Sequence, residues 1–246
     1  MLFVPPFGEE MNKCRRQVTE TAKALMAGGC ASLVVDLYGT GDSNGEFAEA
    51  SWPAWKADIV SAMNWSEIKG LPVEALVATR LGCALAAESL RESGRMVERT
   101  VFWHPVANGK QFITQFLRLR VAASMMMEAD ERETVEALKE RLKNGQCVEV
   151  AGYPLTGKLW NSIENIELLT LMDNSLGNVT IFEVGRTRER KVSNVAERLA
   201  AHAHAQGGEV RTQRIAGEPF WSSTEIVVNP GLTRLTAEYL LQNGGT

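Results

Sequence analysis

The sequence contains few of the residues that mark a metal site or a disulfide framework. Its four cysteines lie far apart and form no Cys-x-x-Cys pair; they are Cys14, Cys30, Cys83 and Cys147. Neither a zinc site nor a set of disulfides is therefore expected. Histidine occurs only three times in 246 residues. We expect reduced cysteines, no metal, no organic cofactor and a cytoplasmic location.

An excess of one charge and long apolar runs are also missing. The 26 basic and 30 acidic residues give a formal net charge of −4 and are mixed along the chain. Such a chain has no electrostatic surface for nucleic acid or for an anionic membrane. No run approaches the roughly 18 consecutive apolar residues that a membrane span needs. Residues 1–4 lead into Pro5 without a basic segment, which is typical of a strand and not of a signal peptide.

The order of apolar segments predicts an α/β architecture. Short β-branched or apolar runs alternate with segments of helical spacing, which favours a mostly parallel sheet with helices on both faces. Between 107 and 174 the alternation breaks down, so we expect an inserted helical cap there and a core formed by 1–106 and 175–246. Strands are expected at 2–4, 31–37, 73–77, 98–103, 178–184 and 209–215.

One of these strands runs into a turn that lacks its expected catalytic residue. The segment Ala78-Thr79-Arg80-Leu81-Gly82 follows an apolar strand and precedes an apolar helical stretch. This context is typical of a nucleophile elbow, whose central residue should be Ser, Cys or Asp. Arg80 occupies that position, and its guanidinium stays protonated and cannot attack a carbonyl.

The order of elements resembles the α/β-hydrolase fold, entered late. That fold normally opens with two further strands, and Met1 lies almost at the third. We therefore expect the first two strands to be missing. An exposed sheet edge would then favour reduced solubility or an edge-mediated homodimer.

Several segments resemble one branch of that superfamily, the exosortase A system-associated hydrolase 2 proteins found beside exopolysaccharide and protein-sorting genes in bacteria. The resemblance covers the chain nearly end to end and implies a hydrolase-like protein that acts on or binds a small acyl or ester ligand under the cap. In this family an arginine at the elbow looks usual. The segments are FVPPFGEEMNK (3–13), VDLYGTGDS (35–43), GEPFW (217–221) and, in the cap, GKQF (109–112) to RLR (118–120).

The other two members of a catalytic triad are also hard to locate. The acid is expected after the strand 178–184, where only Glu189 could serve. The base should be a histidine after the last strand, but the segment 217–221 contains none. The serine, the histidine and a clear acid are therefore all absent from the expected positions.

The backbone of an anion site could persist without the nucleophile. The N–H groups of Phe7 and Leu81 would form the oxyanion hole, the latter at a helix N-terminus that favours negative charge. Arg80 beside them would bind a substrate carboxylate or phosphate through a bidentate contact. Alternatively, Arg80 is internally paired with one of three carboxylates, namely Glu9, Glu10 or Glu218.

Those three glutamates are expected to converge at the carboxyl end of the sheet, where open α/β folds bind ligands. There Glu218 or Glu9 could act as general acid and base on water, which allows hydrolysis without a covalent intermediate. His104 ends a strand at the same edge and could contribute to the site, or it could be a packed strand-end residue. Salt bridges are the alternative role of the glutamates.

The sequence leaves two functional readings open. The first is an ester or acyl hydrolase without a serine, with an apolar acyl pocket lined by Phe112, Phe116 and Met125 to Met127; ordinary cap core explains these residues equally well. The second is a catalytically inactive binding or scaffold protein. A deep pocket with unpaired Arg80 favours the first reading. A paired Arg80, with the cleft filled by Trp103, Phe220 or Trp221, favours the second.

Overall fold

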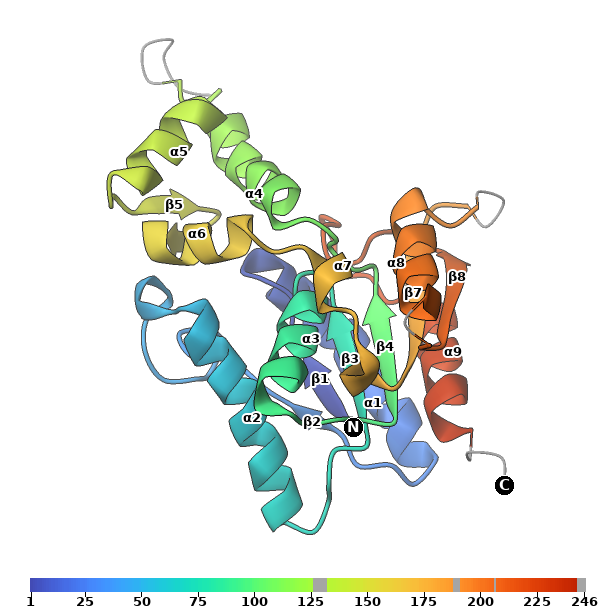
Figure 1. Cartoon of the computed structure of the whole chain (residues 1–246). Helices are drawn as coiled ribbons and strands as arrows, with labels where there is room; N and C mark the ends of the chain where they lie inside the picture. The colour runs from blue at the N-terminus through green and yellow to red at the C-terminus, as the bar shows by residue number, and fades with distance from the viewer. Residues whose placement is uncertain (126–131, 188–190, 206, 243–246) are drawn as a thin grey trace.

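The computed structural model describes residues 1–125, 132–187, 191–205 and 207–242 and contains a six-stranded parallel sheet (Figure 1). The strand order is β2-β1-β3-β4-β7-β8, and every neighbouring pair is parallel. The predicted mostly parallel sheet is thus confirmed. The strands are β1 Leu2–Val4, β2 Leu33–Val34, β3 Ala75–Thr79, β4 Arg99–Trp103, β7 Asn178–Gly185 and β8 Val210–Ala216.

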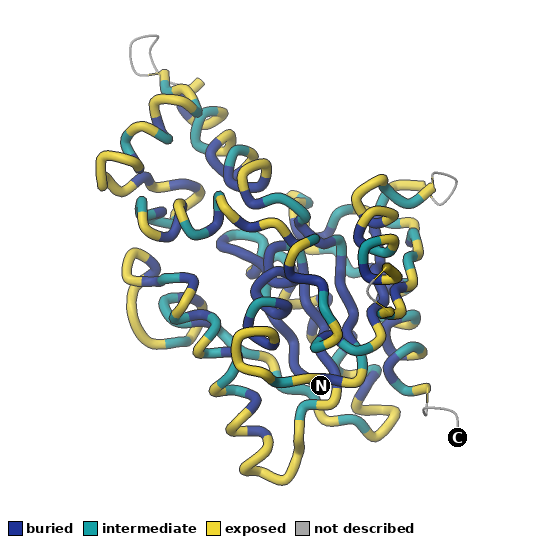
Figure 2. Tube along the Cα trace, viewed as in Figure 1, coloured by how far each residue is buried: buried dark blue, intermediate teal, exposed yellow. Residues whose placement is uncertain are grey.

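Helices cover both faces of the sheet, as the sequence pattern predicts. Helices α1 (Glu9–Ala27) and α9 (Pro230–Leu241) lie on one face, and α2 (Trp52–Ile68), α3 (Gly82–Ser93) and α8 (Asn194–Ala205) on the other (Figure 1). Neighbouring residues of each strand enter opposite cores, because side chains alternate across a sheet. The central strands are accordingly buried along their length (Figure 2).

Strand β2 is much shorter than the predicted strand 31–37. It contains two residues and pairs only with β1, in the register Leu2 with Leu33 and Phe3 with Val34. β1 itself ends before Pro5 and Pro6, which have no N–H group to continue a ladder. Because β1 offers no further residues to pair with, the chain after β2 forms a loop, in which Asp36 is paired with Arg15 of α1 at 2.9 Å.

The segment between β4 and β7 contains helices, as expected, and also a hairpin that the sequence analysis did not anticipate. In the hairpin turn, Ala151 and Gly152 both have positive φ, 52° and 83°, which suits the twist of two antiparallel strands. Alanine at the first turn position gave no signal. The elements are α4 Gly109–Ser124, α5 Val135–Lys143, β5 Val148–Val150, β6 Tyr153–Leu155, α6 Gly157–Glu164 and α7 Leu168–Leu171.

Part of this segment projects beyond the carboxyl ends of the strands. Figure 1 shows α4, α5 and α6 above that edge. The described residues also contain two short 3₁₀ helices, Phe47–Glu49 before α2 and Asn174–Leu176 before β7. Among the described residues, no helix is both long and apolar enough to span a membrane.

Candidate functional site

The backbone of the elbow is kept although its side chain is not a nucleophile. Arg80 follows the last residue of β3 and has φ 54°, a left-handed conformation that is costly for a residue with a side chain. Its N–H donates to the Trp103 carbonyl at 3.0 Å, and its own carbonyl accepts from Cys83 N–H at 3.2 Å. A Cβ on Gly82 would lie 2.2 Å from the Pro5 carbonyl oxygen, so only glycine fits there. Tight packing of the loop after β1 (residues 5–8, hereafter the β1 loop) against the start of α3 therefore fixes the strained turn.

The Arg80 side chain contacts three separate segments. Its Nε donates to Glu10 Oε1 at 3.2 Å, and its Nη1 donates to the carbonyl of His104 at 3.3 Å. Its Cζ lies 5.0 Å from the ring centroid of Trp221, in cation–π geometry. The side chains of Arg80 and Glu10 are each 13% exposed. Arg80 is thus a half-buried charge that is already paired, yet it still reaches solvent.

Glu10 uses only one of its two oxygens in this pair. It lies in the first turn of α1, and its Oε2 is buried and has no hydrogen-bond partner. Burial raises the pKa of the Glu10 carboxyl, and the nearby Arg80 guanidinium partly offsets that rise. A buried carboxylate oxygen without a donor is unusual, so Glu10 is a candidate acceptor for a proton or a ligand.

His104 occupies the position next to Arg80 on the neighbouring strand. It follows β4 and has φ 47°, so the ends of β3 and β4 both carry a non-glycine residue in the left-handed region. Its Nδ1 is buried without a partner. Burial, together with the positive charges of Arg80 and Arg214, lowers the pKa of His104 to about 4. The imidazole is therefore neutral at pH 7.

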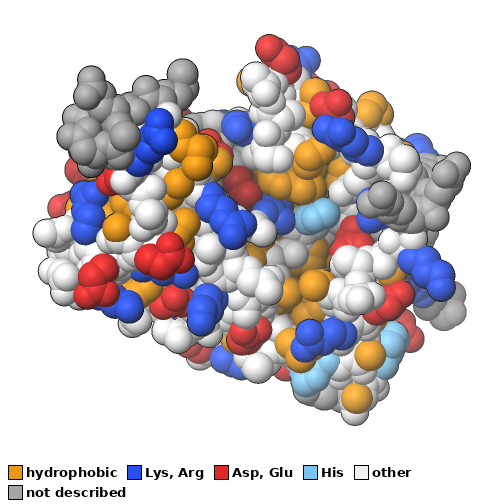
Figure 3. All heavy atoms as spheres, turned by 90° about the horizontal axis from the view of Figure 1, so that it is seen from above, with side chains coloured by type: hydrophobic (Ala, Val, Ile, Leu, Met, Phe, Trp, Pro, Cys, Tyr) orange, Lys and Arg blue, Asp and Glu red, His pale blue; other side chains and the backbone are white. Residues whose placement is uncertain are grey.

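Trp221 lies where a catalytic base was expected after the last strand. Its ring is 4.5 Å from the His104 ring and packs over Arg80, and the ring of Phe220 behind it is 6.0 Å from that of Trp103. The sequence indicated Trp221 only as a side chain that could fill the cleft. Figure 3 looks down on this edge and shows hydrophobic, basic and histidine side chains gathered around a hollow.

Phe7 and Leu81 are buried on the side of the elbow away from Trp221, in the other of the two hydrophobic cores. Within the described residues, neither of their N–H groups donates to a protein acceptor. Both residues line one narrow cavity of about 10 Å³. A water molecule needs roughly that much room, so the cavity holds one water at most.

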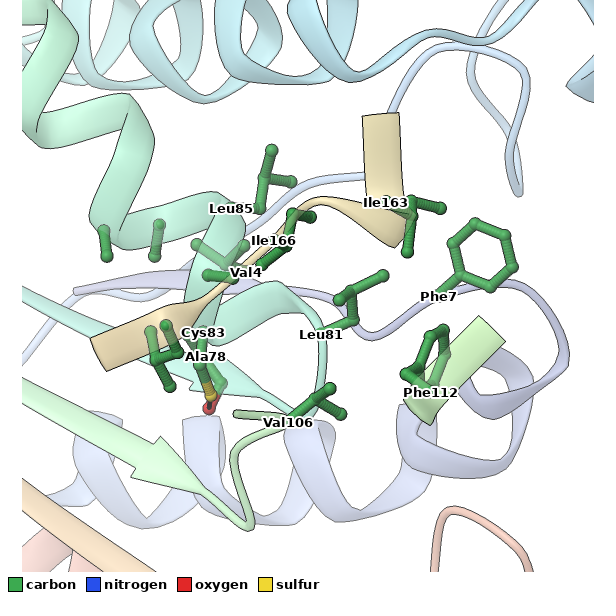
Figure 4. Packing of buried hydrophobic residues seen from close by; sticks show 14 of the residues in the cluster. Val4, Phe7, Ala78, Leu81, Cys83, Leu85, Val106, Phe112, Ile163 and Ile166 are labelled. Carbon is green, nitrogen blue, oxygen red and sulfur yellow. Dashed lines mark hydrogen bonds between the residues drawn. The ribbon is translucent and has the colours of Figure 1, made fainter. Parts of the chain in front are cut away.

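Aromatic side chains fill the space beside that cavity. The Phe7 ring centroid lies 5.7 Å from that of Phe112 and 5.1 Å from that of Phe116, both in α4. Phe47 and Trp55 contact the same ring at 5.7 and 5.8 Å. Figure 4 shows Phe7, Phe112 and Ile163 close together beside Leu81. No acyl chain fits here without a movement of α4. Met125 is exposed, and 126–127 lie outside the described residues.

The structure separates the three candidate glutamates. Only Glu10 is paired with Arg80. Glu9 is half-buried, with a carboxylate oxygen 3.9 Å from Lys13 Nζ. Glu218 is exposed on the loop after β8 and, among the described residues, makes no ion pair. Nothing in the sequence distinguished Glu10 from its neighbours, because the distinction depends on the direction of the first turn of α1.

Other candidate groups have structural partners or lie outside the described residues. Glu189 is among the latter. The buried carboxylate of Glu183 accepts from the Ser193 N–H at 2.6 Å, and Ser193 caps α8. The Cys83 thiol donates to the Ala78 carbonyl at 3.3 Å, and burial raises the pKa of that thiol well above its usual value. In the described part of the chain, no three His, Cys, Asp or Glu side chains gather as metal ligands.

Comparison with known proteins supports the fold. No family model and no curated protein matches the chain. Est1E from Butyrivibrio proteoclasticus, solved with ferulic acid, is 14% identical over 98% of this chain and 87% of its own, with a TM-score of 0.70. An esterase domain from Rhodothermus marinus is 14% identical over 99% and 87%, with a TM-score of 0.60. Mouse alpha/beta hydrolase domain-containing protein 10 is 16% identical over 97% and 86%, with a TM-score of 0.57. The chain has the α/β-hydrolase fold.

Proposed function

We propose that this protein is an ester or acyl hydrolase that activates water directly, without a serine nucleophile. The observation that carries the proposal is the Arg80–Glu10 pair at the elbow, in which Glu10 Oε2 is buried and unpartnered. A cation and a free carboxylate oxygen at this position can together bind an acyl group and accept a proton from water. The solved esterases of the same fold support the reaction class.

In this proposal Arg80 binds the oxygen that becomes negative when water adds to the ester carbonyl. Glu10 Oε2 accepts one proton from that water, and the bond to the alcohol then breaks. The departing alkoxide takes a proton back, which leaves an alcohol and a carboxylic acid. His104, whose backbone carbonyl accepts from Arg80 Nη1, is neutral, and in this proposal its unpartnered Nδ1 orders the water.

The N–H groups of Phe7 and Leu81 remain oxyanion donors in this proposal only if α4 moves, because aromatic rings fill their side of the elbow. Glu10 replaces Glu9 and Glu218 as the preferred acid and base, because it alone is paired with Arg80. The ferulic acid bound to Est1E supports a small acyl compound as the ligand.

The biological setting is part of the same proposal. The similarity of 3–13 and 217–221 to exosortase A system-associated hydrolase 2 proteins supports a role beside exopolysaccharide and protein-sorting systems, in the cytoplasm. The outer edge of β2 has no partner strand among the described residues, and this supports an edge-mediated homodimer.

A second function, a non-catalytic binding or scaffold protein, is favoured by a different observation. Arg80 is already neutralised by Glu10 and covered by Trp221, and the cavity beside Leu81 is almost filled. These are features that a protein keeping the fold after losing its chemistry would show. The two functions differ in whether esters are turned over.

Hydrolysis of a short-chain and a medium-chain nitrophenyl ester by the purified protein tests the proposal. The rate should fall at least tenfold in Arg80→Ala and in Glu10→Gln, equivalent to about 1.4 kcal/mol of transition-state stabilisation. Glu218→Gln is the matched control, because Glu218 is exposed and should leave the rate unchanged. No turnover by the wild type, or equal rates in all variants, would reject the mechanism in favour of the binding function.

A further inference from the structure

A carboxylate ligand beside Arg80 would need hydrogen-bond donors, but the ionised Glu10 that is paired with Arg80 offers only acceptor oxygens. Glu10 Oε1 accepts from Arg80 Nε, but Oε2 is buried and receives no hydrogen bond. Protonation of Oε2 would convert this unpartnered acceptor into a hydrogen-bond donor on the residue that is paired with Arg80.

We infer that Arg80 binds a ligand carboxylate and that Glu10 takes up one proton at Oε2 when the ligand binds. The inference rests on the proposed function and deepens it, because ester hydrolysis leaves a carboxylic acid beside ionised Glu10, and transfer of the acid's proton to Oε2 gives a carboxylate beside protonated Glu10. The complex left after ester hydrolysis and the complex formed by adding a carboxylate to the protein would then be the same species.

The charges at the site require this proton. Arg80 carries one positive charge, Glu10 one negative charge, and His104 is neutral. A second carboxylate beside the pair would leave a net negative charge in a half-buried place, and like charges in one site raise each other's pKa. Uptake of one proton restores neutrality and adds an O–H···O⁻ hydrogen bond, which is a strong contact.

The shape of the site favours a carboxylate over a phosphate. Trp221 covers a face of the guanidinium, so a ligand approaches in the guanidinium plane. Nε is occupied by Glu10 and Nη1 donates to the His104 carbonyl, so the remaining N–H groups form a narrow edge that a planar carboxylate matches. A phosphate monoester carries roughly −1.5 to −2 charges and would need more than one proton.

The groups around Glu10 do not replace it as the titrating residue. Glu9 interacts with Lys13 at 3.9 Å, and burial keeps the neighbouring Cys14 thiol protonated by raising its pKa. The positive charge of Arg214 disfavours a charged His104. The ionisable groups that face Glu10 or His104 are Arg80, Glu9, Lys13, Cys14 and Arg214.

Calorimetric titration of the whole chain with acetate and with butyrate tests the inference. The heat is measured in buffers of different ionisation enthalpy, and the slope gives the protons taken up. We expect uptake of up to one proton per carboxylate and an affinity that rises as the pH falls, with a limiting slope of about tenfold per pH unit. Inorganic phosphate, titrated in parallel, should bind more weakly.

The variants separate the role of each charge. Glu10→Gln carries a permanent donor, so it should bind carboxylate with no proton uptake and with a flat pH dependence. Arg80→Ala should abolish binding, and Glu9→Gln, the matched control, should keep the uptake. Thermal unfolding checks that each variant is folded. If Glu10→Gln does not fold, the number of protons taken up by the wild type still tests the inference.

Some outcomes would overturn the inference. No carboxylate binding at tens of millimolar, binding without proton uptake, or unchanged uptake in Glu10→Gln would each do so. The inference and the proposed function fail separately. Ester turnover without proton-linked carboxylate binding would contradict only the inference. Proton-linked carboxylate binding without ester turnover would support the inference and contradict the proposed hydrolase function.

Discussion

On one side of the Arg80 elbow the side chains fill the space, whereas on the other side they leave polar atoms without partners. The apolar side holds Phe7 and Leu81 around a cavity of about 10 Å³. The polar side holds Glu10 Oε2 and His104 Nδ1, both buried and unpartnered. Strand β3 supports both sides. The difference teaches that the fold preserves the elbow as a scaffold, and that any remaining chemistry belongs to the polar side.

The largest effect should come from emptying the apolar side. Phe7→Ala removes a ring that packs against four other aromatic rings, and such a cavity costs about 4 kcal/mol of unfolding free energy. Urea denaturation measures this loss. Met125→Ala, at an exposed position, is the control and should change little. A cost below about 1 kcal/mol would mean that α4 closes the space, and the contrast between the sides would then be weaker than the packing indicates.

Breaking the polar side should cost somewhat less. Arg80→Ala leaves Glu10 as a half-buried charge without a partner, and we expect a loss of about 3 kcal/mol at neutral pH. The loss should shrink in acid, where Glu10 is protonated and needs no partner. A double-mutant cycle with Glu10→Gln measures the coupling, which should exceed about 1 kcal/mol. Additive effects would show that the pair contributes nothing.

The third prediction uses pH to separate the two sides, because only the polar side titrates. The pKa of His104 is about 4 in the folded protein against 6.5 normally, so the unfolded chain binds more protons between these values. Stability is therefore present above about pH 6.5 and falls as the pH drops towards about 4, by roughly 2 to 3 kcal/mol at about 1.4 kcal/mol per pKa unit. The raised pKa of Glu10 acts in the opposite sense, since its contribution is lost as pH rises through that pKa.

In the same pH series, the unfolding free energy of His104→Asn should fall much less in acid than that of the wild type, because the variant lacks the His104 imidazole. His204→Asn, on the exposed end of α8, is the matched control and should keep the acid-induced fall of the wild type. If both variants follow the wild type, the acid sensitivity comes from other groups and His104 is not held neutral by its surroundings.

The smallest effect should come from Gly82, which lies at the elbow between the two sides. Gly82→Ala places a Cβ 2.2 Å from the Pro5 carbonyl oxygen, so the β1 loop must shift, at a cost of about 1 to 2 kcal/mol. Gly70→Ala is a control with open space around it, although its φ of 74° adds some strain. Thermal unfolding compares the two. A Gly82→Ala protein as stable as the wild type would show that the elbow tolerates looser packing.

Local patterns in the sequence were enough for the sheet and for the elbow. Strand 2–4 ends at two prolines, and the strand before Arg80 ends at a small-x-Arg-x-small turn, so both could be located without knowledge of the rest of the chain. The hairpin 148–155 was missed because its turn uses Ala151 at a left-handed position, where an asparagine or glycine would have given a signal.

The sequence by itself determined the parallel sheet, the Arg80 elbow and the absence of a histidine after the last strand. Only the tertiary structure decided that Glu10, 70 residues away from Arg80, becomes its partner, and that Trp221 covers the guanidinium. Strand periodicity and turn chemistry are local properties that a few neighbouring residues encode. Which of three glutamates reaches Arg80, and whether aromatic rings close the space beside Phe7, depends on how distant segments pack together.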